Sequence, residues 1–538
     1  MGKIPFRRFG AMIDLSRNAV MSVDGLKRFA ATISEMGYNT LLLYMEDVYT
    51  LPGEEYFGYL RGRYSEEELK DVVSYCETIG MEVIPCIQTL AHLDAIMPWP
   101  KYAKICDFAN ILLAGADETY ELVEKMFQFC RRVFKTDTVN IGMDEAHMIG
   151  LGKYLDQNGF ENRFDILSRH LNRVQEIARR YNYKTVMWSD MFFRLSNHGV
   201  YSTDTPCVTA DLEEKIPKDV SLCYWEYYSA DPKRYRKMLA AHKLLGRELW
   251  FAGGSWTWMG FAPHNRFSIL STKAAIQQCR EAGIENVFLT LWGDNGGECS
   301  RFAVLPALFH AAMFAAGETK TENVRRAFRE KYGIGFEAFC DLDLFGPKVG
   351  KTAECVKNPD KYLLYNDYFC GMCDSTLTGK EGEAYAHYSR ALSRNCNDPA
   401  FGVLFRRGKT LCDVLKIKAD LGQRTRRAYE SGDREEMKKV IASYREIEKK
   451  LPLFIRAHRE AWFAENKPFG FDVQEIRLGG LLLRTKSCRE RLEKYLADGE
   501  KIPELEEKLL DFAGGGEEFA KEPRRISTYK RAVTPHVL

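Results

Sequence analysis

The sequence predicts an α/β protein: a (β/α)8 TIM barrel followed by a mostly α-helical C-terminal domain. Short apolar and β-branched runs alternate with amphipathic helical stretches about eight times between residues 8 and 318. Beyond residue 320 the alternation ends, and long charged segments with helical spacing follow. The 538 residues suffice for both parts, because such a barrel occupies about 250 residues or more. We therefore expect a barrel over residues 1–318 and a helical domain over residues 319–538.

Eight segments have the composition and length of buried strands. They span residues 9–14, 39–44, 82–87, 138–143, 185–188, 221–225, 248–252 and 286–291. Helical spacing fills most intervals, over residues 22–36, 65–79, 119–134, 163–181, 232–245, 270–282 and 302–316. Ser65 with Glu68 predicts a capping box, and Gly80 stands where a helix C-cap is expected. Between the fifth and sixth strands only residues 210–215 have a helical pattern.

The C-terminal part has the apolar spacing of long amphipathic helices. The residues that recur at this spacing are Met437, Val440, Ile441, Tyr444, Ile447 and Leu451, and also Leu404, Leu411, Val414 and Leu421. Turns are expected at residues 432–433 and 467–470, where glycine or proline interrupts the pattern.

Composition excludes several classes of protein. Seventy-seven Lys and Arg against 75 Asp and Glu give a net charge of +2, too small a field to gather nucleic acid. Fifteen cysteines without paired spacing fit a reducing compartment better than a disulfide framework. No apolar stretch approaches the roughly 20 residues of a membrane span, and no signal-type segment opens the chain. We expect a cytoplasmic protein that binds neither nucleic acid nor membrane.

The expected strand ends carry acids and aromatic residues, where a barrel places its catalytic groups. The polar residues are Asp14 with Arg17, Glu46, Asp47, His92, Asp144, Glu145, Asp190, Glu226 and Asp294. The aromatic residues are Trp188, Trp225, Tyr227, Tyr228, Trp256, Trp258 and Trp292, which include five of the eight tryptophans. A sugar ring has apolar C–H faces and hydroxyl edges, which flat aromatic walls, carboxylates and a guanidinium match. This set therefore predicts a carbohydrate site.

The adjacent pair Asp144-Glu145 points to a particular glycosidase mechanism. Conventional glycosidases place two carboxyl groups on opposite sides of the scissile bond, about 5 Å apart when they retain configuration. Consecutive residues do not easily straddle a bond in this way. The pair suits a mechanism in which Glu145 protonates the leaving oxygen while Asp144 holds a neighbouring group of the substrate that attacks.

These residues resemble glycoside hydrolase family 20, the β-N-acetylhexosaminidases, over residues 8–318. The likeness rests on Asp14-Leu15-Ser16-Arg17 at the first strand, the run from Arg63 through Pro85, Leu90-Ala91-His92, Gly142-Met143-Asp144-Glu145, and the Trp188/Asp190 and Trp292/Asp294 pairs. The resemblance implies that Glu145 is the general acid/base and that Asp144 orients the 2-acetamido group, whose carbonyl oxygen is the nucleophile. It also implies that Arg17 binds the hydroxyls at sugar carbons three and four.

The resemblance has gaps. Tyr227 or Tyr228 is offered for the hydrogen bond to the acetamido oxygen, because the family's Tyr-Leu-Asp motif is absent. His92 belongs either to a relay near the acid or to loop packing. The family's usual α/β domain before the barrel is missing, Asp294 stands where many members have Glu, and the helical region is outside the common family core. We expect an exo-acting enzyme on N-acetylglucosamine and/or N-acetylgalactosamine β-glycosides, with retention.

Two alternatives stay open. A conventional retaining β-glycosidase would pair Glu145 with a remote carboxylate such as Glu226 or Glu298, and a non-catalytic sugar-binding barrel would keep only Arg17 and the tryptophans. No cofactor or metal is expected, since Cys370 and Cys373 form a lone pair without a second half. The expected partner is a small-molecule or oligosaccharide substrate with a terminal N-acetylhexosamine, and a homodimer is possible through the helical region.

Overall fold

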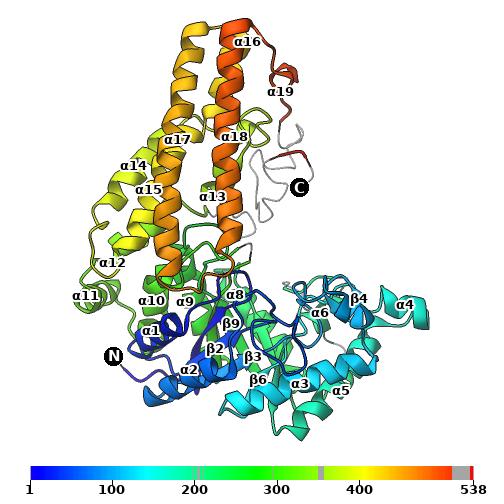
Figure 1. Ribbon diagram of the computed structural model, residues 1–538. Helices are drawn as coiled ribbons and strands as arrows, with labels where there is room; N and C mark the ends of the chain where they lie inside the picture. Colours follow the sequence, from blue (N-terminus) through cyan, green and yellow to red (C-terminus); the bar gives the residue numbers. More distant parts are fainter. Residues whose placement is uncertain are drawn as a thin grey trace. The chain divides into compact units, whose positions relative to one another are not determined.

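The protein contains a closed barrel of eight parallel strands, which confirms the predicted fold class. The computed structural model describes residues 2–197, 199–202, 206, 208, 210–294, 296–348, 357–511 and 534–536. The barrel order is β1-β10-β9-β8-β7-β6-β3-β2, so β1 pairs with both β2 and β10 to close the sheet. Figure 1 shows several of these strands surrounded by helices. The strands are β1 (Arg8–Asp14), β2 (Thr40–Tyr44), β3 (Glu82–Cys86), β6 (Thr138–Asn140), β7 (Lys184–Trp188), β8 (Val220–Trp225), β9 (Leu249–Gly254) and β10 (Asn286–Leu291).

Helices lie between these strands and cover the barrel. They are α1 (Val23–Ser34), α2 (Glu66–Thr78), α3 (Asp117–Val133), α4 (Lys153–Asn158), α5 (Arg163–Arg180), α6 (Asp190–Ser196), α7 (Ala210–Lys215), α8 (Pro232–Lys243), α9 (Asn265–Glu281) and α10 (Leu305–Ala315). The predicted capping box is present, because Ser65 accepts from the Glu68 amide and Glu68 accepts from the Ser65 amide. Each expected strand and helix exists, with ends shifted by a few residues.

The fourth barrel strand is shorter than expected. Residues 138–143 were expected to be extended, but β6 ends at Asn140, because Gly142 and Met143 have φ values of 72° and 68°. A small antiparallel pair, β4 (Cys106–Phe108) and β5 (Ile111–Leu112), lies in the connection after β3 and was not predicted. Short elements of this kind leave little periodicity in the sequence.

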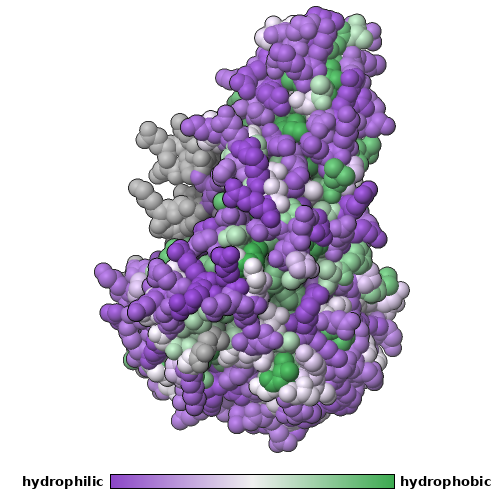
Figure 2. Space-filling model, turned by 90° about the vertical axis from the view of Figure 1, so that its left-hand side faces the viewer, coloured by the Kyte–Doolittle hydropathy of each residue, from purple (hydrophilic) through white to green (hydrophobic). Residues whose placement is uncertain are grey.

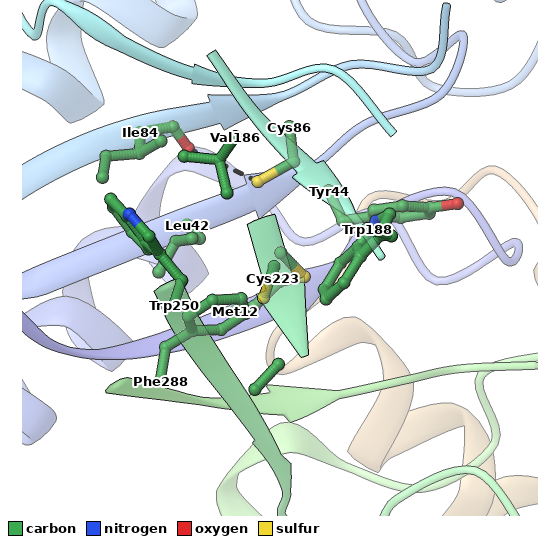
Figure 3. Close-up of a cluster of buried hydrophobic side chains, with 11 residues drawn as sticks. Met12, Leu42, Tyr44, Ile84, Cys86, Val186, Trp188, Cys223, Trp250 and Phe288 are labelled. Atoms are coloured by element: carbon green, nitrogen blue, oxygen red, sulfur yellow. Dashed lines mark hydrogen bonds between the residues drawn. The ribbon is translucent and has the colours of Figure 1, made fainter. Parts of the chain in front are cut away.

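The barrel interior is filled by large apolar side chains from several strands. Figure 3 shows Met12, Leu42, Ile84, Val186, Trp250 and Phe288 converging there, and each is at most 2% exposed. Complete burial of a Leu, Ile or Phe side chain contributes roughly 1.5–3 kcal/mol. Trp188 and Tyr44 extend this cluster, and the partly buried Trp225 and Trp292 pack against it. The packed interior thus supports the residues that follow the strand ends.

The C-terminal part is helical. Its elements are α11 (Thr321–Tyr332), α12 (Phe336–Cys340), α13 (Pro359–Tyr365), α14 (Glu381–Ser393), α15 (Gly402–Lys418), α16 (Leu421–Ser431), α17 (Arg434–Phe463), α18 (Phe471–Asp498) and α19 (Pro503–Glu506). The expected turn at 432–433 separates α16 from α17: Gly432 has φ of 64°, and Asp433 caps α17 by accepting from the Glu435 and Glu436 amides.

The chain forms two compact units that do not follow a single cut. The first contains Met1–Ser255, Phe267–Trp292 and Ala307–Val324. The second contains Trp256–Arg266, Gly293–Pro306 and Arg325–Leu538. The segments that follow β9 and β10 therefore group with the helices of the C-terminal part.

The face of the molecule drawn in Figure 2 is largely hydrophilic. On the face drawn in Figure 2, hydrophobic residues occur as small patches among hydrophilic ones. Within the described ranges, no helix has both the length and the apolar character needed to cross a membrane.

Candidate active site

Polar residues at the ends of β1, β2, β3, β6 and β7, or shortly after them, form one connected set in the first unit. Hydrogen bonds or ion pairs link the members Asp14, Arg17, Tyr44, Glu46, Gln88, His92, Asp144, Glu145, Asp190 and Arg194. The sequence indicated most of these residues from their place at strand ends. The expected gathering of Asp144, Glu145, His92 and Asp190 is present.

The backbone before the Asp144-Glu145 pair has an unusual conformation. Gly142, Met143 and Glu145 have φ values of 72°, 68° and 52°. A Cβ on Gly142 would lie 2.0 Å from Gln88 Oε1, and this same oxygen accepts from the Met143 amide at 3.2 Å. Left-handed conformations at non-glycine residues cost on the order of 1–3 kcal/mol each and persist only where surrounding contacts impose them. Gln88 therefore helps to impose the turn that presents the two acids.

One hydrogen bond and one ion pair hold Asp144. Gln88 Nε2 donates to Oδ1 at 2.8 Å, and His92 Nε2 lies 3.2 Å from Oδ2. Burial alone would raise the pKa of Asp144, but the His92 charge and the Gln88 hydrogen bond outweigh it and lower this pKa. Burial would likewise lower the pKa of His92, yet the Asp144 carboxylate raises it to about 9. At neutral pH the pair is a carboxylate and an imidazolium.

Glu145 has a different environment from its neighbour. Its side chain is 44% exposed, whereas that of Asp144 is 13% exposed. Its carboxylate oxygens lie 3.8 Å from His92 Nε2 and 3.8 Å from Arg194 Nη2. One acid is thus fixed within the protein, while the other reaches solvent.

Asp190 lies beneath Glu145. It is fully buried, and its Oδ2 accepts from the Glu145 amide at 3.1 Å and from Arg194 Nε at 3.2 Å. Burial and the nearby charge of Asp144 raise the pKa of Asp190 to about 7, although Arg194 opposes the shift. The sugar-binding role expected for Asp190 stays a prediction. In the structure its carboxylate contacts the Glu145 amide and the Arg194 side chain.

Arg17 is fixed between two acids and two aromatic rings. Its guanidinium lies 3.3 Å from Asp14 Oδ2 and 3.3 Å from Glu46 Oε1. It also lies 5.0 Å from the centroid of Tyr44 and 5.5 Å from that of Trp292, within the range of cation–π attraction. Its side chain is 21% exposed, so the guanidinium is oriented but still accessible.

Sequence reasoning missed the parts that Tyr44 and Gln88 play. Tyr44 donates to Glu46 Oε1 at 3.0 Å and accepts from Gln88 Nε2 at 2.9 Å. This links Arg17 through Glu46 and Tyr44 to Gln88 and Asp144. Gln88 lies two residues after the end of β3, and this position near a strand end was the available signal.

Aromatic rings from β7, β8 and β10 stand together in the first unit. The Trp292 ring centroid lies 4.7 Å from that of Tyr44, 6.2 Å from Trp188 and 6.5 Å from Tyr227. Tyr227 stacks on Trp225 at 5.2 Å. Trp188 is 1% exposed, while Trp225 and Trp292 are partly exposed. Tyr228 is also partly exposed, and its amide donates to Glu226 Oε1 at 2.8 Å.

Three other predicted residues belong to the second unit. Trp256 and Trp258 follow β9 and stack on each other at 4.7 Å, with exposures of 1% and 4%. Asp294 follows β10, is partly exposed and has φ of 26°.

The two carboxylates considered as conventional nucleophiles are already engaged. Glu226 accepts from Ser202 Oγ at 2.6 Å as well as from the Tyr228 amide. Glu298 lies in the second unit and forms a buried ion pair with Lys361 Nζ at 2.9 Å and a second with Arg477 at 3.2 Å. The chain therefore uses these two acids in internal contacts.

Comparison with known proteins agrees with this geometry. The family model for the glycosyl hydrolase family 20 catalytic domain matches residues 5–241, and that for the glycoside hydrolase 20C C-terminal domain matches residues 337–522. Together the two matches cover more than three quarters of the chain.

Individual relatives are distant. Hexosaminidase D of Bos taurus is 25% identical over 239 residues, which are 42% of this chain and 63% of the relative. Hexosaminidase D of Homo sapiens is 24% identical over 252 residues, 45% of this chain and 49% of the relative. The matches thus span less than two thirds of these relatives. A solved exo β-N-acetylglucosaminidase of Vibrio harveyi aligns with a TM-score of 0.46 at 16% identity, over 63% of this chain and 58% of that one. From its two domain matches, the chain belongs to glycosyl hydrolase family 20.

Proposed function

We propose that the protein is an exo-acting β-N-acetylhexosaminidase. It removes terminal N-acetylglucosamine or N-acetylgalactosamine from β-glycosides with retention of configuration, and the substrate's own acetamido group acts as nucleophile. The observation that carries the proposal is the unequal environment of Asp144 and Glu145: Asp144 is ionised, clamped and little exposed, whereas Glu145 reaches solvent. The hexosaminidases among the relatives support the same class of substrate.

In the first step the acetamido carbonyl oxygen attacks the anomeric carbon. The bond from that carbon to the leaving oxygen breaks as Glu145 transfers its proton to this oxygen, which gives a bicyclic oxazolinium ion. Asp144 accepts a hydrogen bond from the acetamido N–H and stabilises the positive charge that develops on this nitrogen. Because His92 and Gln88 fix the carboxylate before the substrate arrives, little reorganisation is needed during the reaction.

In the second step water attacks the anomeric carbon from the face that the leaving group left. Glu145, now a carboxylate, accepts a proton from this water, and the oxazolinium ring opens to restore the acetamido group. Two inversions at the same carbon give net retention. No carboxylate of the protein forms a covalent bond, in keeping with the internal contacts of Glu226 and Glu298.

Other residues hold the sugar. Arg17 donates to hydroxyls through the part of its guanidinium that Asp14 and Glu46 leave free, and Trp292 provides a flat wall beside it. Trp225 provides a further partly exposed aromatic face, whereas Trp188 is 1% exposed and packs against Trp292. Tyr227 or Tyr228 donates to the acetamido oxygen.

The test compares two aryl β-glycosides that differ only in having a 2-acetamido group or a 2-hydroxyl. We expect hydrolysis of the first only. Glu145→Gln should nearly abolish turnover while binding of N-acetylglucosamine persists, and Asp144→Asn should reduce turnover strongly. Glu285→Gln, which changes a carboxylate with a 67% exposed side chain, is the matched control. Equal hydrolysis of both glycosides would support the conventional retaining mechanism, and binding without any turnover would support a non-catalytic barrel.

A further inference from the structure

An exposed aromatic cluster lies in the loops after β2 and β3, outside the residues described above. Tyr56 and Tyr59 come from the loop after β2, and Trp99 comes from the loop after β3. The Trp99 ring centroid lies 4.9 Å from that of Tyr56 and 5.6 Å from that of Tyr59, and the two tyrosines are 6.1 Å apart. Tyr56 is 42% exposed, Tyr59 is 44% exposed, and Trp99 is partly exposed. We call these three residues the aromatic platform.

The two loops that carry the platform are fastened to each other. Glu54, only 7% exposed, accepts from Tyr102 at 3.0 Å and from Lys125 at 2.6 Å, and it pairs with Lys101 at 3.0 Å. Lys101 also donates to the Gly53 carbonyl at 2.7 Å. Because Lys101 and Tyr102 lie two and three residues after Trp99, these contacts fix the tryptophan against the tyrosine-bearing loop.

The loop after β2 is itself closely packed. Phe57 lies between Tyr56 and Tyr59 in the sequence and is fully buried. Its ring packs edge-on against that of Tyr49, with the centroids 5.1 Å apart. Gly58 has φ of 66°, and a Cβ there would meet the Asp47 carbonyl oxygen at 2.3 Å. The exposed rings are therefore presented by an anchored backbone, so little conformational entropy is lost when a ligand stacks on them.

Both loops adjoin the proposed active site. In one loop, Arg61 pairs with Asp47 at 2.9 Å and donates to the Ser16 carbonyl at 2.5 Å. Asp47 and Ser16 are the sequence neighbours of Glu46 and Arg17, respectively. In the other, His92 contacts Asp144, and the same loop continues to Trp99. Strand β3 pairs with both β2 and β6, so the platform and the Asp144-Glu145 pair follow neighbouring strands at the same end of the barrel.

We propose that the aromatic platform binds the aglycone sugar, the residue on the reducing-end side of the bond that is cleaved. This inference rests on the proposed function and extends it to the substrate, which becomes an oligosaccharide. An exo-acting enzyme binds the terminal sugar at Asp144 and Glu145, so the next sugar must lie beyond these two residues, toward the rim of the barrel. Exposed Tyr and Trp faces match the C–H face of a pyranose, and the charged Lys101 and Glu55 beside them can meet its hydroxyls.

The experiment compares two substrates with the same terminal sugar. One is the β-1,4-linked trisaccharide of N-acetylglucosamine, and the other is ethyl β-N-acetylglucosaminide, which has no aglycone ring. Trp99→Ala and Tyr59→Ala should lower kcat/KM for the trisaccharide about tenfold, in line with the loss of one stacking contact, and less than twofold for the ethyl glycoside. Trp99→Phe should restore most of the difference. Phe469→Ala, at a 40% exposed aromatic residue in the helical region, should affect neither substrate.

Binding is measured separately, so that this inference and the proposed function can fail independently. Calorimetric titration of the trisaccharide into Glu145→Gln should show about tenfold weaker binding when Trp99→Ala is added. Weaker binding together with an inactive wild type would overturn the proposed hydrolysis but keep the platform as a sugar site. The platform's role would be overturned if the variants lowered kcat/KM equally for both substrates, or for neither. It would also be overturned if sedimentation showed that Trp99→Ala converts a dimer to a monomer.

Discussion

The contact between His92 and Asp144 predicts a specific dependence of stability on pH. The pKa of His92 is raised from 6.5 to about 9 in the folded protein. A difference of about 2.5 pKa units at 1.36 kcal/mol each corresponds to about 3 kcal/mol. The stabilisation is fully present below pH 6.5, where His92 is charged in both states, and is lost as pH rises through 9. The lowered pKa of Asp144 reflects the same contact, so it adds no second contribution.

The assay is urea unfolding of wild type and His92→Gln at about pH 6 and about pH 10. At the lower pH the variant should be less stable by up to about 3 kcal/mol, and at the higher pH the difference should shrink toward zero. His387→Gln, at an exposed histidine of α14, is the control and should leave the free energy of unfolding unchanged at both pH values. A His92→Gln deficit of the same size at both pH values would refute the charged pair and leave only a packing role for His92.

Three further predictions concern positioning, sugar binding and the second unit. Asp190→Ala removes the acceptor of the Glu145 amide, so kcat should fall by up to about 100-fold with KM little changed. Asp190→Asn retains an acceptor oxygen, so its kcat should fall less, and steady-state kinetics of both variants test this. Arg17→Lys loses the planar guanidinium that spans Asp14 and Glu46, so KM for the terminal sugar should rise about tenfold or more, and an unchanged KM would argue against a sugar-binding role. Lys361→Met leaves Glu298 with Arg477 alone and should lower the free energy of unfolding in urea by about 3–5 kcal/mol. Adding Glu298→Gln should recover much of this loss, whereas no recovery would mean that the ion pair is not its cause.

The barrel could be predicted because its strands and helices differ in period. Buried parallel strands such as β2 and β10 are continuous apolar runs, and the helices between them carry apolar stripes and caps such as the Ser65–Glu68 box. The end of β6 could not be predicted in the same way. The positive φ of Met143 is imposed by Gln88, which is 55 residues away in sequence, and local propensity does not contain this contact.

The site was predictable in its composition but not in its division of roles. Strand-end logic indicated Asp144, Glu145, His92, Asp190 and Arg17, and the structure brings these five together. It did not reveal that Asp190 is fully buried under Glu145, because burial depends on how α6 packs after β7. The aromatic platform escaped prediction for a related reason: Tyr56, Tyr59 and Trp99 lie deep in two loops, and only their mutual stacking gives them meaning.

The helical part of the chain fixes two loops that a sequence boundary near 318 would assign to the barrel alone. Within the second unit, Asp360 of α13 accepts from the Phe261 amide at 2.7 Å, and Asp343 accepts from the Asn265 amide at 2.8 Å. Arg407 of α15 donates to the Phe261 carbonyl at 2.9 Å and to the Glu298 carbonyl at 2.6 Å, so one guanidinium joins the segments after β9 and β10.

These contacts decide what a shortened chain would lose. A chain cut at residue 318 would keep both loops but remove the carboxylates and the guanidinium that satisfy their backbone groups. Buried backbone groups left without partners cost about 1–3 kcal/mol each, so the loops would not hold their present conformation. Trp256, Trp258 and Asp294 lie in these segments, so the helical region determines the backbone conformation that presents them.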